Sequence, residues 1–268
     1  AINLNFLPVP IVWLLSIAGA FIFGAAWAFI PAYLQAKRGS HVVITTIMFN
    51  FIASSLMVYL LVDVIRDMKQ MGPHTVALPK ELWLPSFKDF AALFGIKIRY
   101  SPLNASFFLA IAASFFVWFL VWKTKWGYEM RAVGHNTQAA IYAGISPYKN
   151  IIIAMLISGG LAGLLSINEV MGVHHKIVSG FPAGYGFTGI AVALMGRNHP
   201  IGIFPAAFLF GILYQGGSEV TFDMPNITRY MFVAVQGVII LFSGALENLF
   251  RPQIESFFVN RLNRQVEA

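Results

Sequence analysis

Residues 106–153, SFFLAIAASFFVWFLVWKTKWGYEMRAVGHNTQAAIYAGISPYKNIII, decide the fold because a polar segment stands between two apolar ones. The first apolar segment, residues 106–122, is long enough to cross a membrane as an α-helix, since about 17 to 25 apolar residues span the hydrocarbon. The polar segment carries Glu129 and Arg131, and a charged side chain at the bilayer centre costs about 2.5–3.5 kcal/mol or more. We therefore expect the chain to leave the membrane after this first span and to re-enter it at about Ile151.

The composition of the whole chain agrees with a protein made of such spans. Hydrophobic residues make up 58% of the 268 residues, charged residues only 11%, and the mean hydropathy is +0.71. Soluble domains contain about 25% charged residues. The chain is therefore an integral membrane protein of the all-α class, a polytopic transmembrane helical bundle with room for five or six spans in a single domain over residues 1–268.

The basic residues give the orientation of the spans. The formal net charge is +7, but the Lys and Arg residues lie in short clusters beside apolar segments, as topology signals do, and not in a stripe that would bind nucleic acid. Lys37 and Arg38 follow the first span, and Lys123 and Lys125 follow the third. These pairs place residues 123–149 in the cytoplasm, and we expect lipid, not nucleic acid, around the chain.

The apolar segments predict six spans and one long loop. Alternation places the loop, residues 63–104, on the extracytoplasmic side although it carries six Lys or Arg residues, because long loops do not follow the charge rule closely. Its core, PKELWLPSFKDFAALFG at residues 79–95, predicts a short amphipathic helix. The predicted spans run over about residues 10–34, 42–62, 106–122, 151–171, 201–215 and 230–249.

One region does not fit a simple span. In residues 176–200, KIVSGFPAGYGFTGIAVALMGRNHP, the apolar run at 190–195 is far too short to cross the membrane. Non-helical backbone at membrane depth is tolerated only inside protein or beside a cavity, so a broken or re-entrant helix is predicted here. Either its polar end caps helix ends or gates a path, or it is no more than a tight turn at the interface. The candidate gating or helix-breaking residues are Gly186, Gly196, Arg197, Asn198 and His199.

Small and polar residues within the spans suggest contacts between helices or with a solute. Gly159 and Gly163 form a GxxxG pair, which lets a second helix approach closely. Polar side chains in a span face protein or water, and they serve either a substrate or hydrogen bonds between helices, worth about 0.6 kcal/mol on average. The candidate residues of a substrate pathway are Thr45, Thr46, Asn50, Asn168, Glu169 and Gln236.

The polar segment itself favours a short helix with a small-residue surface. Asn136 is the predicted N-cap, and Gly134 and Gly144 are predicted to mark the bends on either side. Alanine side chains, as at Ala139 and Ala140, let another surface come close. The segment is either a docking helix for a cytoplasmic partner or a solvated connector.

Three motifs, in order along the chain, resemble those of a known family. VVITTIMFNFIA at residues 42–53, RAVGHNTQAAIYAGI at 131–145 and GFTGIAVALMGRNHPIGI at 186–203 are similar to segments of bacterial ABC importer permeases of the branched-chain amino acid and simple sugar class. The third is typical of the nucleoside or simple-sugar subgroup.

The resemblance implies a transport subunit that moves a small polar solute, a nucleoside or a simple sugar, across the inner membrane. Its implied partners are cytoplasmic ATP-binding subunits, a second permease subunit and an extracytoplasmic substrate-binding protein. Only one span precedes the first motif, so we expect the natural chain to have further N-terminal spans. The implied coupling helix, which would dock on an ATP-binding subunit, includes Arg131, Gly134, Asn136, Ala139, Ala140 and Gly144.

Two other classes remain open from the residues alone. One is an ion-coupled secondary transporter or channel, with Glu169 as the coupling carboxylate. The other is a membrane enzyme or assembly scaffold using His199 or Glu169. The sequence contains no phosphate-binding GxxxxGK[ST] loop, no HExxH, no GxSxG and no cysteine, so we expect neither an ATPase site nor a cofactor, and the adjacent His174 and His175 do not have metal-binding spacing.

Overall fold

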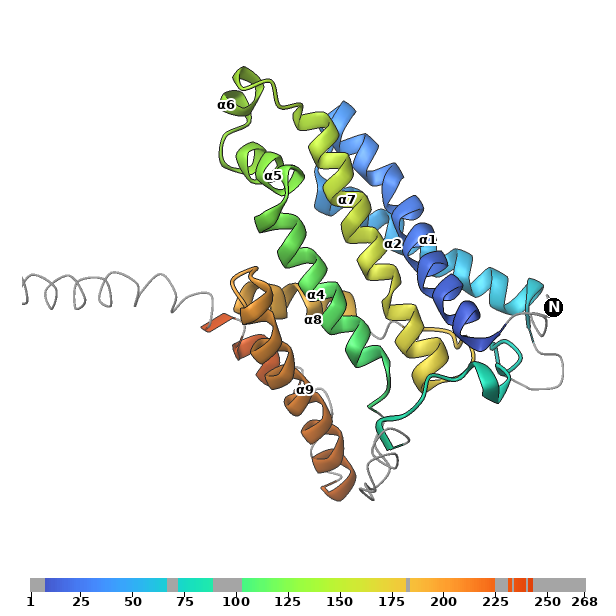
Figure 1. The fold of residues 1–268 in the computed structure, drawn as a ribbon. Coiled ribbons are helices and arrows are strands. Elements are labelled where there is room, and N and C mark those ends of the chain that lie inside the picture. Colours follow the sequence, from blue (N-terminus) through green and yellow to red (C-terminus); the bar gives the residue numbers. More distant parts are fainter. Residues whose placement is uncertain are drawn as a thin grey trace, which may run out of the picture. The chain divides into compact units, whose positions relative to one another are not determined.

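The computed structural model describes residues 8–66, 72–88, 103–181, 184–224, 231–232, 234–239 and 241–242 (Figure 1). Regular structure in these residues is helical, apart from two isolated β-bridges, His74 to Val178 and Ser86 to Asn104. They contain five helices long and apolar enough to cross a membrane, which confirms the predicted all-α bundle. The chain divides into two compact units, Ala1–Ala183 and Gly184–Ala268. The five helices are Val9–Arg38, Val42–Val64, Ser106–Lys123, Pro147–Val173 and Pro200–Thr221.

The first unit is built on the close packing of α1 (Val9–Arg38) against α7 (Pro147–Gly163), which lie side by side in Figure 1. A Cβ atom on Gly24 of α1 would collide with the carbonyl oxygen of Gly159, and one on Gly163 would collide with the carbonyl oxygen of Ala20. Only glycine allows the two backbones to approach this closely. The GxxxG prediction is confirmed, and we call this contact the glycine seam.

Two other helices of this unit bury little of their surface. α2 (Val42–Tyr59) continues into a π-helical turn, η1 (Leu60–Val64), and none of the α2 residues is buried. It contacts α1 through an edge-on ring pair, Trp27 and Phe49, with centroids 5.9 Å apart. α4 (Ser106–Lys123) buries only Leu120. Both match the predicted spans.

At the far end of α7, the helix continues into a π-helical segment, η3 (Ile167–Val173), which meets residues 72–88. The Leu84 N–H donates to the Met171 carbonyl over 3.0 Å. The Trp83 and His175 rings stack with centroids 3.7 Å apart. Segments about 90 residues apart in sequence are therefore joined here.

The amphipathic helix predicted for residues 79–95 is wrong over residues 83–86. One 3₁₀ turn forms at η2 (Lys80–Leu82), Trp83 to Ser86 are not helical, and Phe87 and Lys88 are helical. Pro85 disfavours a helical conformation at Leu84, and the Leu84 N–H is used in the bond to η3. Residues 89–95 lie outside the described residues.

The second unit contains α8 (Tyr185–Met195) and α9 (Pro200–Asp223), which pack through Ala191, Val192, Ala206 and Phe210. With 11 residues, α8 is too short to cross a membrane, so the predicted helix break is confirmed.

α9 extends eight residues beyond its predicted end at residue 215. The Gln215 side chain donates to Glu219 over 3.0 Å, and the Thr221 hydroxyl donates to the Gly217 carbonyl over 2.8 Å. The Gln215–Glu219 pair, four residues apart, supports the helix across its two adjacent glycines. Of the span predicted at 230–249, the described residues 231–232, 234–239 and 241–242 are helical.

Candidate functional site

The connection between α4 and α7 forms two short helices, α5 (Lys125–His135) and α6 (Thr137–Tyr142). Thr124 caps α5: its hydroxyl accepts from the Gly127 N–H over 3.2 Å and donates to the Leu120 carbonyl over 2.6 Å. A Cβ atom on Gly127 would collide with the carbonyl oxygens of Leu120 and Val121. The start of α5 is therefore held directly against the end of α4.

Asn136 separates the two helices. Its backbone is extended, with φ −154° and ψ 106°, and its side-chain oxygen accepts from the Ala139 N–H over 3.0 Å. The predicted N-cap is confirmed. Gly134 was predicted to mark a bend, but it lies inside α5, and the break falls at Asn136 because the cap needs a non-helical residue there. Gly144, with φ +76°, does mark the turn that follows α6.

The two alanines of α6 have different surroundings. Ala140 is 3% exposed, and its carbonyl accepts from the Ile145 N–H over 2.9 Å. Ala139 is exposed, as are Ile141 at 51% and Tyr142 at 93%. One alanine therefore packs α6 against its own chain, and the other belongs to an open surface. Arg131 and Gly134 on α5 are also exposed.

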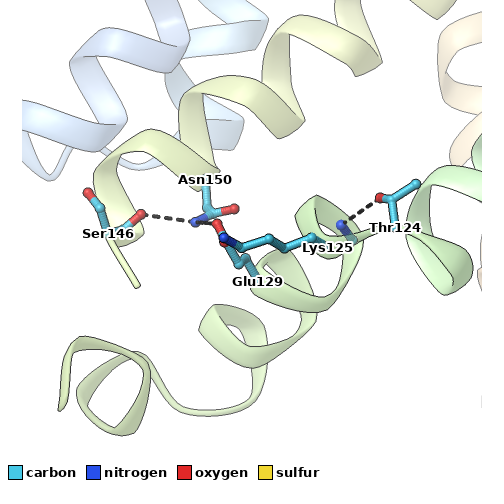
Figure 2. Close-up of polar contacts among 6 residues, drawn as sticks. Thr124, Lys125, Glu129, Ser146 and Asn150 are labelled. Atoms are coloured by element: carbon cyan, nitrogen blue, oxygen red, sulfur yellow. Dashed lines mark hydrogen bonds and ion pairs between the residues drawn. The ribbon is translucent and has the colours of Figure 1, made fainter. Parts of the chain in front are cut away.

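A polar cluster links α5 to α7 (Figure 2). The Asn150 amide donates to the Ser146 carbonyl over 3.1 Å and to the Glu129 carboxylate over 3.5 Å. Asn150 is only 5% exposed. Lys125 lies 3.9 Å from the same carboxylate, but its side chain is 85% exposed. The sequence prediction missed Thr124, Glu129 and Asn150, although a cap residue three positions before Gly127 and an asparagine at the start of an apolar helix were visible signals.

Of the predicted pathway residues of α2, Thr45 is half-buried and Thr46 is exposed. The Thr45 and Thr46 hydroxyls both bond to backbone carbonyls one turn earlier, at Val42 over 3.0 and 2.9 Å respectively. Asn50 is exposed. Gln236, in the second unit, is half-buried in a helical stretch.

Asn168 and Glu169 form a different group, at the far end of α7. The Asn168 side-chain oxygen accepts from Asn104 over 3.1 Å and from the Ser106 hydroxyl over 2.7 Å. Its amide donates to Glu169 over 3.0 Å, and the other Glu169 oxygen lies 3.5 Å from the His174 ring. Glu169 is 5% exposed. This arrangement favours the structural alternative for both residues, hydrogen bonding between segments.

The candidate gating residues form a tight turn between α8 and α9. Arg197 and Asn198 have φ +55° and +53°, in the left-handed region, and the Asn198 N–H donates to the Ala193 carbonyl over 2.8 Å. His199 caps α9 by accepting from the Ile201 N–H over 3.3 Å. The predicted tight turn and the predicted helix cap are therefore both present, and the gating role stays a prediction.

The glycines of this region act at different points. A Cβ atom on Gly196 would lie 2.6 Å from the Ile203 nitrogen, so this position requires a glycine where α8 meets α9. Gly186 lies within the first turn of α8, and the break before α8 falls at Gly184, with φ +80°. Gly186 is thus not the break itself, because the left-handed residue at the helix start precedes it.

No group of three or more His, Asp or Glu side chains in the part of the chain that the structure describes is placed to hold a metal ion. His174 faces Glu169, and His175 stacks on Trp83. The two histidines thus point to different neighbours.

The class that this fold defines is a multi-pass helical membrane protein. It has five helices long and apolar enough to span a membrane, one apolar helix too short to do so, and a polar two-helix connection between two of the spans. The chain belongs to the family of permease components of branched-chain amino acid transport systems, whose model matches residues 2–244. Its location is the bacterial inner membrane.

Three relatives illustrate the similarity. The guanosine ABC transporter permease protein NupP of Bacillus subtilis is 36% identical over 85% of this chain and 63% of its own length. The glucose ABC transporter permease protein TsgB13 of Haloferax volcanii is 31% identical over 98% and 69%, and the nucleoside ABC transporter permease protein NupB of Lactococcus lactis is 35% identical over 80% and 59%. The chain thus spans about two thirds of the length of these relatives. No solved structure matches it significantly.

Proposed function

We propose that this chain forms the membrane permease part of an ATP-binding cassette importer and moves a small polar solute inward. Family membership and the names of the relatives support this assignment. The implied assembly contains cytoplasmic ATP-binding subunits, a second permease subunit and an extracytoplasmic substrate-binding protein.

The single observation that carries the coupling role is the α5–α6 connection. It is a folded polar unit fixed at Thr124 to the end of α4 and at Asn150 to the start of α7. A solvated connector would not need a buried glycine, two side-chain caps and a buried asparagine. On this proposal residues 123–149 lie in the cytoplasm, and α6 docks on an ATP-binding subunit with its exposed face. That face includes Ala139, Ile141 and Tyr142.

The solute is proposed to be a nucleoside in the first place and a simple sugar in the second, since two of the three relatives are named for guanosine or nucleosides and one for glucose. A neutral solute of this kind needs hydroxyl and amide partners. Asn50 and Gln236 are the better candidates on this chain, because the other predicted pathway residues bond to their own helix or to each other.

Two variants of α6 test the coupling role. We expect Ala139→Trp to reduce uptake and substrate-stimulated ATP hydrolysis without changing thermal unfolding, because the side chain fills an open docking surface. Ala139→Ser is the matched control and should behave as the wild type. Ala140→Trp should instead destabilise the protein, by about 1–3 kcal/mol, because Ala140 is packed inside the chain.

The assay uses the complete transporter in sealed proteoliposomes with labelled guanosine, uridine and glucose as probes. Co-purification of an ATP-binding subunit with the wild type supports the importer. Uptake that persists without ATP and needs an ion gradient would instead support the ion-coupled alternative. Normal ATP-driven uptake by Ala139→Trp would contradict the docking role of α6.

A further inference from the structure

We propose that the contact between Glu129 and Asn150 is a positioning contact that carries the movement of the coupling segment into α7. This inference rests on the proposed function, since it assumes that α5 and α6 are moved by an ATP-binding subunit. It assigns a role to two residues that contact each other between α5 and α7.

The burial of Asn150 identifies it as more than a surface polar residue. It stands at the fourth position of α7, is 5% exposed, and uses its amide nitrogen twice, toward the Ser146 carbonyl and toward Glu129 (Figure 2). Buried polar groups are nearly always hydrogen-bonded. The Ser146 bond lies within the first turn of the same helix, so the Glu129 bond is the one that reaches a different helix.

Glu129 lies in the middle of α5, away from the cap that holds the start of this helix. Thr124 and Gly127 fix that start against α4. The Glu129 contact then fixes the helix against α7. A helix attached at two points to two different spans cannot rotate about either attachment, so its displacement passes to both.

A displacement of α7 also moves α1, because the glycine seam joins the two helices. Close backbone packing at Gly24, Gly159 and Gly163 leaves no side-chain layer that could yield between the two helices. A push on the start of α7 therefore moves the α1–α7 pair as one body.

The charge on Glu129 is not what makes the contact. Lys125 approaches the carboxylate at 3.9 Å from a side chain that is 85% exposed, and exposed pairs of this kind contribute little. The positioning role belongs to the hydrogen bond from a buried amide, which an uncharged acceptor can also receive.

The chain contains no cysteine, so spin labels can be attached at introduced cysteines without removing native ones. We suggest Tyr128→Cys, exposed on α5, and Ala162→Cys, exposed on α7. Ala162 lies twelve residues beyond Asn150, about 18 Å along the helix. The distance between labels then reports on the angle between α5 and α7 in the complete transporter, with and without ATP.

In the wild type we expect one narrow distance distribution that ATP does not change. Glu129→Ala should broaden it and reduce ATP-driven uptake by about two- to thirtyfold, the range over which single residues modulate coupling between sites, while the ATP-binding subunit still co-purifies. Glu129→Gln, which keeps an acceptor, and Lys125→Ala, which removes only the exposed partner, should both behave as the wild type. Asn150→Ser, which keeps a bond to Ser146 but is too short to reach Glu129, should match Glu129→Ala.

A narrow distribution and wild-type uptake in both Glu129→Ala and Asn150→Ser would overturn the proposal, as would a loss in Glu129→Gln equal to that in Glu129→Ala. The distance measurement does not depend on the solute. Failure of the wild type to recruit an ATP-binding subunit would contradict the proposed function, whereas a subunit that is recruited and stimulated equally in all variants would contradict this inference alone.

Discussion

α7 and α2 are similar in sequence character but differ in how the chain packs them. Each belongs to a predicted span of almost equal mean hydropathy, 2.0 for Pro147–Val173 and 1.9 for Val42–Val64. Within the most apolar window of each, 17% of the residues of the first are buried and only 6% of the second. Hydropathy therefore places both helices in the membrane but does not tell which one the chain itself covers.

The residues that decide this difference are small ones at helical spacing. Gly159 and Gly163 lie one turn apart on α7 and pack against Gly24 and Ala28 of α1, so the two backbones are in contact. α2 has β-branched and aromatic residues over most of its length and keeps its neighbours at side-chain distance, as at Phe49. The chain therefore buries more of α7 than of α2.

The strongest test of the comparison is a large side chain in the seam. Gly24→Leu should destabilise the protein by about 3 kcal/mol or more, at the upper end of overpacking effects, because its Cβ alone collides with the Gly159 carbonyl. Gly19→Leu, on the same helix but with nothing within 4 Å of its Cβ position, should be neutral or stabilising by up to about 0.8 kcal/mol. Thermal unfolding in a mild detergent measures both effects. Equal losses of stability in the two variants would show that the glycine seam does not account for the difference between α7 and α2.

A smaller loss of stability is expected at η3, beyond the glycine seam, where side-chain hydrogen bonds join Asn168 to Asn104 and Ser106. Asn168→Leu removes the acceptor for Asn104 and Ser106 and should cost about 1–3 kcal/mol. Glu169→Gln keeps an acceptor for the Asn168 amide, so it should reduce stability by less than Asn168→Leu and leave ATP-driven uptake intact.

Unfolding and uptake should be measured together for this pair. If uptake were abolished in Glu169→Gln while stability stayed normal, Glu169 would be a coupling carboxylate, as in the ion-coupled alternative. Ser166→Ala is a suitable control, since within the described residues the Ser166 hydroxyl bonds only to the carbonyl of Gly163, three residues earlier.

Sequence patterns predicted the features that depend on near neighbours. The spans follow from the length of the apolar runs, the Asn136 cap from its side chain, and the short α8 from the glycines and prolines on either side of it. They failed where a distant segment decides the local conformation. Leu84 gives its N–H to Met171, so the helix predicted over residues 79–95 is interrupted at residues 83–86, and no local signal in the sequence indicates this bond.

For the candidate site, the sequence predicted the location but not the contacts of individual side chains. The sequence indicated which segment to examine, but not that Ala140 is inside and Ala139 outside, because two adjacent alanines of a six-residue helix carry no pattern of their own. The pairing of Glu129 with Asn150 spans 21 residues and two helices. It depends on the angle at which α5 meets α7, which spacing along the sequence does not give.

The smallest effect on stability, and the most informative one for α2, is expected for Asn50→Leu. Asn50 is exposed in the structure and lies within a span, where a polar side chain normally faces protein or water. Because Asn50 is exposed and none of the α2 residues is buried, the substitution should leave thermal unfolding within about 0.5 kcal/mol of the wild type. Uptake should fall if this face lines the solute path, whereas Met48→Leu, an apolar change on the same helix, should not alter it. If Asn50→Leu lowered the unfolding temperature as much as Asn168→Leu does, the asparagine would bind a neighbouring helix, and α2 would be packed like α7, with its partner supplied from beyond the described residues.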